Sequence, residues 1–214
     1  MNPQLTERLI CPRCGPGFGL VLRADQVEQG RVLDGFLGCS NCRVLYPVAR
    51  GVADLRHPPR SRSHRRARAV PPLTSRGAPE LDALRLAALI GVARGPALIA
   101  VVGDLAGHGS ELASLLPDVE VVALAPRFHS SPAAGASHLM ASDRLPLRDG
   151  SLAGIALAGS WAELLLQDGL RCLARSGRIV LAGASREGQK AFHGQDLTVL
   201  ADEAGVVVGR LGQG

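Results

Sequence analysis

The sequence predicts an α/β protein in which a doubly wound sheet follows a small, β-rich, metal-binding segment. Short apolar runs alternate with stretches of helical spacing over the last two thirds of the chain, a pattern typical of parallel strands joined by helices. Two Cys-x-x-Cys pairs precede this pattern and lie within the first 42 residues. A segment rich in Arg and Pro separates the two regions.

The four N-terminal cysteines have the spacing of a tetrahedral zinc site. Cys11 and Cys14 form one pair, Cys39 and Cys42 form the other, and 24 residues lie between the pairs. The two-residue turn lets both sulfurs of a pair face one ion, and the long gap fits two or three strands that return the second pair to the first. Two disulfides are the alternative, but they need an oxidising compartment, and the first ten residues contain no apolar run typical of a signal peptide. We therefore expect a cytoplasmic protein with a structural zinc ion, because four protein ligands leave no open coordination position.

Residues next to the cysteines fit this interpretation. Gly15 follows the first pair, where a metal-binding turn often needs a positive φ. Arg13 and Arg43 are expected to offset the formal charge of about −2 on a zinc ion with four thiolates.

The positive charge of the chain is concentrated in one segment. The net charge is +5, yet residues 56–76 hold seven arginines and no acid, while the parts before and after carry +1 and −3. With several prolines and few apolar residues, this segment cannot bury a core and is expected to be an exposed linker. The alternative is an arm that binds nucleic acid or an acidic partner, but no aromatic residue is interleaved for base stacking.

These observations divide the chain into three parts. We predict a zinc ribbon at 1–55, a basic linker at 56–78 and an α/β domain at 79–214. No apolar stretch reaches ~18 residues, so no membrane-spanning helix is expected. Helices are predicted at 79–93, 107–116, 161–174 and 197–204, and strands at 97–102, 119–124, 138–141, 152–157, 178–182 and 206–211.

The N-terminal segment resembles a known family. Leu9-Ile-Cys-Pro-Arg-Cys14, Gly38-Cys-Ser-Asn-Cys42, Leu45-Tyr-Pro-Val48 and Gly51-Val52 follow in the order found in the zinc-ribbon activator subunit of tRNA and release-factor methyltransferases. That ribbon also occurs fused ahead of bacterial methyltransferase domains. The resemblance covers residues 9–55 and implies another methyltransferase, or a different protein, as partner.

The remainder, about residues 79–211, resembles a class I S-adenosylmethionine-dependent methyltransferase with a Rossmann-like fold. Residues 101–109 stand where that family has its glycine loop, residues 142–152 match its loop into strand four, and residues 173–180 match its turn into strand five. The resemblance implies S-adenosylmethionine as cofactor. It places the cofactor-binding residues at Gly103, Asp104, Gly107, Gly109 and Asp143.

Several departures weaken the implied cofactor site. The family's acid on the ribose hydroxyls is Ala125 here, and its adenine-reading position falls near Ala141. Losing a charge-assisted hydrogen bond costs ~1.5–3 kcal/mol, so two losses weaken binding by roughly 10²–10⁴ unless Asp143 or Glu120 compensates. The chain is also expected to stop after about six strands, without the final antiparallel one.

The expected function is therefore that of a degenerate methyltransferase-like scaffold or regulatory protein. The alternatives are an active methyltransferase on a small molecule, and an RNA- or ribosome-associated adaptor that uses residues 56–76. No catalytic constellation can be assembled from the sequence. His108 is expected to face solvent, Cys172 to lie in the core, and Trp161 to lie at a strand-to-helix junction.

Overall fold

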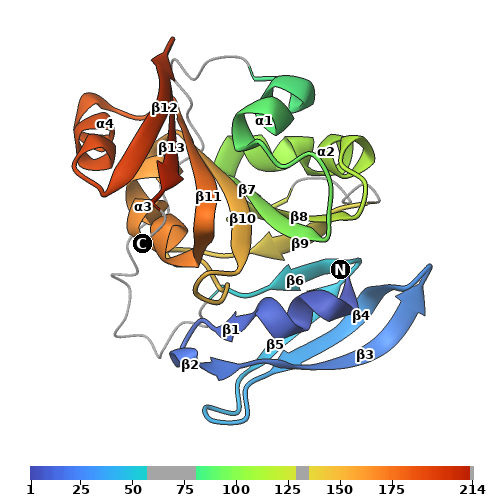
Figure 1. Cartoon of the computed structure of the whole chain (residues 1–214). Helices are drawn as coiled ribbons and strands as arrows, with labels where there is room; N and C mark the ends of the chain where they lie inside the picture. Colours follow the sequence, from blue (N-terminus) through green and yellow to red (C-terminus); the bar gives the residue numbers. More distant parts are fainter. Residues whose placement is uncertain (57–80, 129–134, 213–214) are drawn as a thin grey trace.

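The computed structural model describes residues 1–56, 81–128 and 135–212. It confirms an α/β fold built on one 11-stranded sheet, with a separate two-stranded sheet formed by β1 and β2 (Figure 1). The strands are β1 (Ile10–Cys11), β2 (Gly15–Gly19), β3 (Val21–Glu28), β4 (Arg31–Gly38), β5 (Leu45–Ala49), β6 (Val52–Asp54), β7 (Ala97–Val102), β8 (Val119–Ala125), β9 (Ser137–Met140), β10 (Leu152–Ala158), β11 (Leu173–Ala182), β12 (Leu197–Glu203) and β13 (Val206–Leu211). The helices are the 3-10 helices η1 (Pro3–Arg8) and η3 (Gly103–His108), and the α-helices α1 (Ala83–Ile90), α2 (Gly109–Leu115), α3 (Ser160–Cys172) and α4 (Arg186–His193).

The centre of the sheet is parallel and covered on both faces. Strands β9, β8, β7, β10 and β11 lie side by side in that order, and all four pairings are parallel. Because side chains alternate along a strand, Ile99 and Val101 of β7 pack in the cluster that contains α1 and α2. Ala100 and Val102 of the same strand pack in the cluster that contains α3. The short apolar runs in the sequence are therefore strands buried on both faces.

The C-terminal part differs from the sequence prediction. Residues 197–204 were expected to form a helix, but Leu197–Glu203 form β12, which is antiparallel to β13. Ala204 and Gly205 have φ of 51° and 77°, so they form the two-residue hairpin connection that requires positive φ at both positions. β13 inserts between β12 and β11, antiparallel to both. The expectation of a sheet truncated at about six strands is therefore wrong, because this portion has seven strands and keeps the final antiparallel one.

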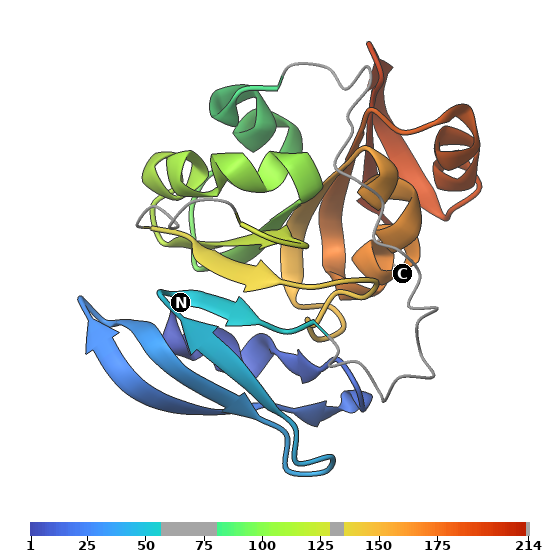
Figure 2. The same cartoon turned by 180° about the vertical axis from the view of Figure 1, so that it is seen from behind.

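The N-terminal strands extend the same sheet. β6 pairs in parallel with β9, and β5, β4 and β3 follow in antiparallel order to the sheet edge. Figure 2 shows β6 (cyan) beside β9 (yellow), with the remaining N-terminal strands below them. Ala53 of β6 is fully buried and pairs with Leu139. The edge of the α/β sheet at β9 is thus covered by the chain's own N-terminal segment.

Other predictions agree in part. The helix predicted at 107–116 begins as η3 and continues as α2, and the helix predicted at 79–93 ends at Ile90 because Gly91 adopts a left-handed conformation. α4 was not predicted, since its sequence is polar and contains a glycine.

The linker at 56–78 lies outside the described residues, apart from Arg56. No helix among the described residues is both long and apolar enough to cross a membrane.

Candidate functional site

The structure brings the four predicted metal ligands together. The Sγ atoms of Cys11, Cys14, Cys39 and Cys42 all lie within 4.8 Å of one another. Cys11 and Cys39 are buried, and Cys14 and Cys42 are half-buried. None of the five cysteines forms a disulfide. This arrangement can hold one metal ion and fits the thiolate set that zinc prefers.

Polar groups around the cluster donate to its sulfurs. Asn41 Nδ2 donates to Cys14 Sγ at 3.4 Å, and the Tyr46 hydroxyl lies 3.6 Å from Cys11 Sγ. Tyr46 is 1% exposed, and its burial raises the pKa of the phenol, so the hydroxyl keeps its proton and donates to a Cys11 thiolate. The predicted turn geometry is also present, because Gly15 has a φ of 84°. Sequence reasoning did not identify Tyr46 and Asn41 as donors, although both lie in the quoted motifs.

The thiols cannot all ionise easily without a cation. Burial alone raises the pKa of Cys39, but backbone N–H groups of Cys42 and Asn41 bring it down to about 7. Burial and the neighbouring thiols raise the pKa of Cys42 to about 12, and burial raises that of Cys11. A bound cation removes this conflict, because it stabilises all four thiolates together.

The fifth cysteine has a different environment. Cys172 is fully buried at the end of α3, as predicted, and its thiol donates to the Leu147 carbonyl at 3.5 Å. Burial raises its pKa to about 12, so it is an unreactive core residue.

The predicted cofactor loop follows β7 and consists of η3 and the start of α2. Gly103 has a φ of 74°. A Cβ on Gly109 would lie 2.9 Å from Ala123 Cβ, so this glycine permits close packing of α2 on β8. A Cβ on Gly107 would meet nothing within 4 Å, so the backbone there is open to approach.

The two predicted acids lie on separate loops. Asp104 belongs to the cofactor loop and is exposed, and partial desolvation raises the pKa of its carboxyl. Asp143 is exposed and follows β9. Neither acid forms a hydrogen bond or ion pair with the residues that the structure describes. His108 lies on the loop as expected, half-exposed, with Nδ1 3.4 Å from Glu111.

An indole packs against the cofactor loop. Trp161 is 2% exposed at the junction of β10 and α3, and its Cδ1 lies 3.2 Å from the point where a Cβ on Gly103 would sit. An acid in place of Gly103 would meet this ring and would also have to adopt a positive φ. Position 103 therefore favours glycine, and the acid of this loop stands at the next position, Asp104. Sequence reasoning placed Trp161 correctly but did not identify this contact.

The two alanines at the positions where the resemblance implied acids are also buried. Ala125 ends β8 and is 5% exposed, Ala141 follows β9 and is 2% exposed, and the Ala141 N–H donates to the Ala125 carbonyl at 3.2 Å. Their methyl groups offer no acceptor to a ribose or an adenine amine.

The indole N–H of Trp161 has no hydrogen-bond partner among the described residues. We therefore expect Trp161→Phe to lower the free energy of unfolding by no more than about 3 kcal/mol, since the smaller ring leaves part of the indole volume empty but no hydrogen bond is lost. Urea unfolding of both proteins measures this difference. A loss above about 3 kcal/mol would show that the N–H is satisfied by a group that binds there.

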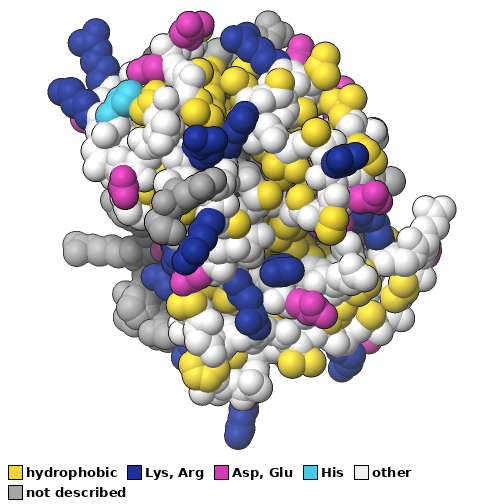
Figure 3. All heavy atoms as spheres, viewed as in Figure 1, with side chains coloured by type: hydrophobic (Ala, Val, Ile, Leu, Met, Phe, Trp, Pro, Cys, Tyr) yellow, Lys and Arg dark blue, Asp and Glu magenta, His cyan; other side chains and the backbone are white. Residues whose placement is uncertain are grey.

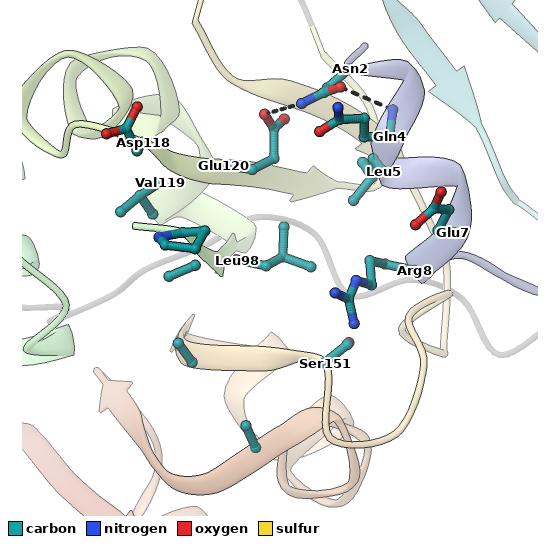
Figure 4. A pocket seen from close by; sticks show the side chains of 14 residues that line it. Asn2, Gln4, Leu5, Glu7, Arg8, Leu98, Asp118, Val119, Glu120 and Ser151 are labelled. Atoms are coloured by element: carbon teal, nitrogen blue, oxygen red, sulfur yellow. Dashed lines mark hydrogen bonds between the residues drawn. The ribbon is translucent and has the colours of Figure 1, made fainter. Parts of the chain in front are cut away.

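A cavity of about 760 Å³ opens at the amino ends of the parallel strands, whereas the cofactor loop lies at the carboxyl end of β7 (Figure 4). It lies between η1 and the amino ends of β7, β8, β10 and β11. Glu120 lines it and accepts hydrogen bonds from Asn2 Nδ2 at 2.8 Å and Ser137 Oγ at 2.5 Å. Parallel sheets of this type bind ligands at the carboxyl ends of their strands. Glu120 therefore cannot compensate for the acids replaced by Ala125 and Ala141, which leaves Asp143 as the other residue considered for that role.

Comparisons with known proteins give a likeness of fold. No family model and no curated protein matches the chain. Among solved structures, a predicted O-methyltransferase from Agrobacterium tumefaciens is 17% identical, with 62% of this chain and 82% of that chain covered and a TM-score of 0.47. A putative S-adenosylmethionine-dependent methyltransferase from Methanococcus maripaludis is 12% identical (62% and 84% covered, TM-score 0.48), and a SAM-dependent methyltransferase from Aquifex aeolicus is 14% identical (61% and 89% covered, TM-score 0.48). None of these likenesses identifies a family, and the α/β fold of the chain is shown by its own strand order.

Proposed function

We propose that this protein is a methyltransferase-like scaffold or regulatory subunit with a structural zinc site, and that it does not bind S-adenosylmethionine tightly. It acts through a partner, for which another methyltransferase is the expected class. The observation that carries the proposal is the Trp161 indole packed against Gly103, at the point where the cofactor loop leaves β7.

Two further observations support the proposal. The positions expected to bind the ribose and the adenine are the buried alanines Ala125 and Ala141. Glu120 is held by Asn2 at the amino ends of the strands, away from the cofactor loop. The zinc assignment rests on the four converging sulfurs and on the donors Tyr46 and Asn41. The three-part division of the chain remains part of this proposal, with the ribbon joined to the α/β portion through β6 and β9.

A thermal-shift experiment tests the cofactor part. At 1 mM S-adenosylmethionine, a Kd of 1 mM or weaker stabilises the protein by no more than about 0.4 kcal/mol. For a chain of this size, that corresponds to a Tm increase below about 2 °C, which is the expected result. A Kd near 1 μM would instead give about 4 kcal/mol and a shift of roughly 8–16 °C, and would contradict the proposal.

The second candidate is an active methyltransferase on a small molecule. The open space around Gly107 and the exposed Asp104 favour it, because both leave part of the loop accessible. Methyl transfer needs little from the protein beyond orientation of an activated methyl donor. Transfer of a labelled methyl group to a substrate, abolished by Gly107→Val and retained in the matched variant Gly17→Val on β2, would establish this candidate.

A further inference from the structure

The cavity at the amino ends of the parallel strands is built by two distant parts of the chain. η1 forms one wall, and residues at the starts of β8, β7 and β10 form the other. Asn2, just before η1, donates to Glu120 on β8 at 2.8 Å. At the other end of η1, the Arg8 carbonyl accepts the N–H of Arg148, in the connection into β10, at 2.9 Å. η1 therefore lies across the amino ends of the strands from β8 to β10.

The end of the cavity at β10 carries a cation. The Arg8 side chain points toward Ser151 (Figure 4) and forms no ion pair or hydrogen bond among the described residues. The Ser151 hydroxyl is fixed beside it, because its Oγ donates to the Arg148 carbonyl at 2.7 Å. Glu7 also lines the cavity, but adjacent side chains of a helix with three residues per turn diverge by about 120°. The unpaired guanidinium can bind a carboxylate through two parallel hydrogen bonds.

The end of the cavity at β8 carries carboxylates. Asp118 directly precedes β8, and Glu120 is its second residue. Glu120 is already paired with Asn2 and lies 3.5 Å from Arg31 Nη2. The exposed Asp118 carboxylate has no partner among the residues that the structure describes. This end therefore offers an unpaired acceptor for an amino group.

Apolar side chains and one amide lie between the two ends. Leu98 on β7 and Ala153 on β10 line the cavity, and so does the Gln4 side chain on η1. On the face seen in Figure 3, dark blue, magenta and yellow side chains lie together where η1 meets the sheet. Because β8, β7 and β10 are neighbours, two strand spacings of about 4.8 Å, or roughly 10 Å, separate the anionic end from the cationic end. An extended chain of three residues spans about the same distance.

We propose that this cavity binds a short peptide of about three small apolar residues, with its carboxylate on Arg8 and its amino group on Asp118. A free peptide carries opposite charges at its two ends, in the arrangement that the cavity complements, and its amide groups can pair with Gln4. The cavity volume of about 760 Å³ accommodates a ligand of this size. The site lies away from the loop after β7 and does not depend on the proposed scaffold function.

Isothermal titration calorimetry with trialanine tests the proposal on the zinc-loaded full chain. A ligand of this size is expected to bind with a Kd of roughly 0.1–1 mM. Amidation of the peptide carboxylate and acetylation of its amino group should each weaken binding about tenfold, because each removes a charge-assisted hydrogen bond. An ω-amino acid of similar length, 8-aminooctanoate, has the two charges but no peptide group and should bind at least about threefold more weakly.

Two substitutions assign the ends of the ligand. Arg8→Gln should weaken trialanine binding about tenfold and leave the affinity of the amidated peptide unchanged. Asp118→Asn should have the same effect on trialanine and leave the affinity of the acetylated peptide unchanged. Both side chains are exposed, and Asn tolerates the φ of 59° at position 118, so the fold is kept.

Arg186→Gln removes an exposed arginine from α4 and is the matched control for charge. It should change the Kd of trialanine by less than about twofold. The proposal is overturned if trialanine shows no saturable binding up to about 10 mM, or if either cavity variant binds it like this control. Equal affinities for trialanine and 8-aminooctanoate would overturn the assignment of a peptide.

Discussion

Replacing Cys39 by Ser is expected to remove the metal and unfold the N-terminal strands. The four sulfurs lie within 4.8 Å of one another, and losing one ligand leaves three crowded thiols whose ionisation the fold does not support. Structural zinc sites contribute an apparent binding free energy of roughly 10–16 kcal/mol in isolated zinc-finger peptides, so the loss exceeds that of an ordinary point mutation. Metal analysis should fall from one zinc ion per chain to none, and Tm should fall by more than about 10 °C.

Cys172→Ser is the matched control for this variant. Cys172 is buried as completely as Cys11, but it lies in α3 and outside the cluster. The Cys172→Ser protein should retain one zinc ion per chain and lose no more than about 1–2 kcal/mol in its free energy of unfolding. A Cys39→Ser protein that keeps its zinc and its Tm would show that the cluster is not a structural metal site.

Arg171→Ala is expected to lower the free energy of unfolding by about 2–4 kcal/mol. The Arg171 guanidinium donates to the carbonyls of Leu145 and Leu147 at 3.0 and 2.8 Å, and to Asp168 and Asp149 at 3.1 and 2.5 Å. Asp168 in turn accepts the Leu145 N–H at 2.8 Å. Removing the guanidinium leaves a largely buried carboxylate and two carbonyls without their donors.

This network also joins the two portions of the molecule. The connection that Arg171 holds contacts β1, because the Ile10 N–H donates to the Pro146 carbonyl at 3.0 Å, and Leu9, just before β1, forms a β-bridge with Leu147. Urea unfolding should therefore show destabilisation of the whole chain, with hydrogen exchange accelerated in both β1 and α3. The exposed Arg175, which forms no ion pair among the described residues, is the control, and Arg175→Ala should change stability by less than about 0.5 kcal/mol. Equal effects of the two substitutions would show that the network contributes nothing.

The sequence predicted the parts of the fold that rest on strong local patterns. The buried strands β7, β8, β10 and β11 were found because they are short apolar runs between helical stretches. β12 was missed because Leu197, Leu200, Ala201 and Ala204 have helical spacing, and the decisive signal was the turn at Ala204 and Gly205. The pairing of β6 with β9 could not be predicted, since a contact between residues so far apart leaves no local pattern.

For the candidate sites too, local patterns were predictable from the sequence and contacts between distant residues were not. The four cysteines were predicted because ligand spacing is a local property, and the structure confirms that they converge. The cofactor loop stays a prediction from its glycines, whereas the packing of Trp161 against Gly103 depends on two elements that meet only in the fold. Likewise, only the fold shows that Glu120 lies at the amino ends of the strands, too far from the cofactor loop to contribute to it.

The proposed function requires that the loop after β7 does not bind S-adenosylmethionine tightly. Isothermal titration calorimetry of S-adenosylmethionine into the zinc-loaded full chain measures this directly. We expect no saturable heat with a Kd below about 100 μM, since Ala125 and Ala141 supply no charge-assisted hydrogen bonds and the Trp161 indole packs against Gly103. A one-to-one isotherm with a micromolar Kd would contradict it.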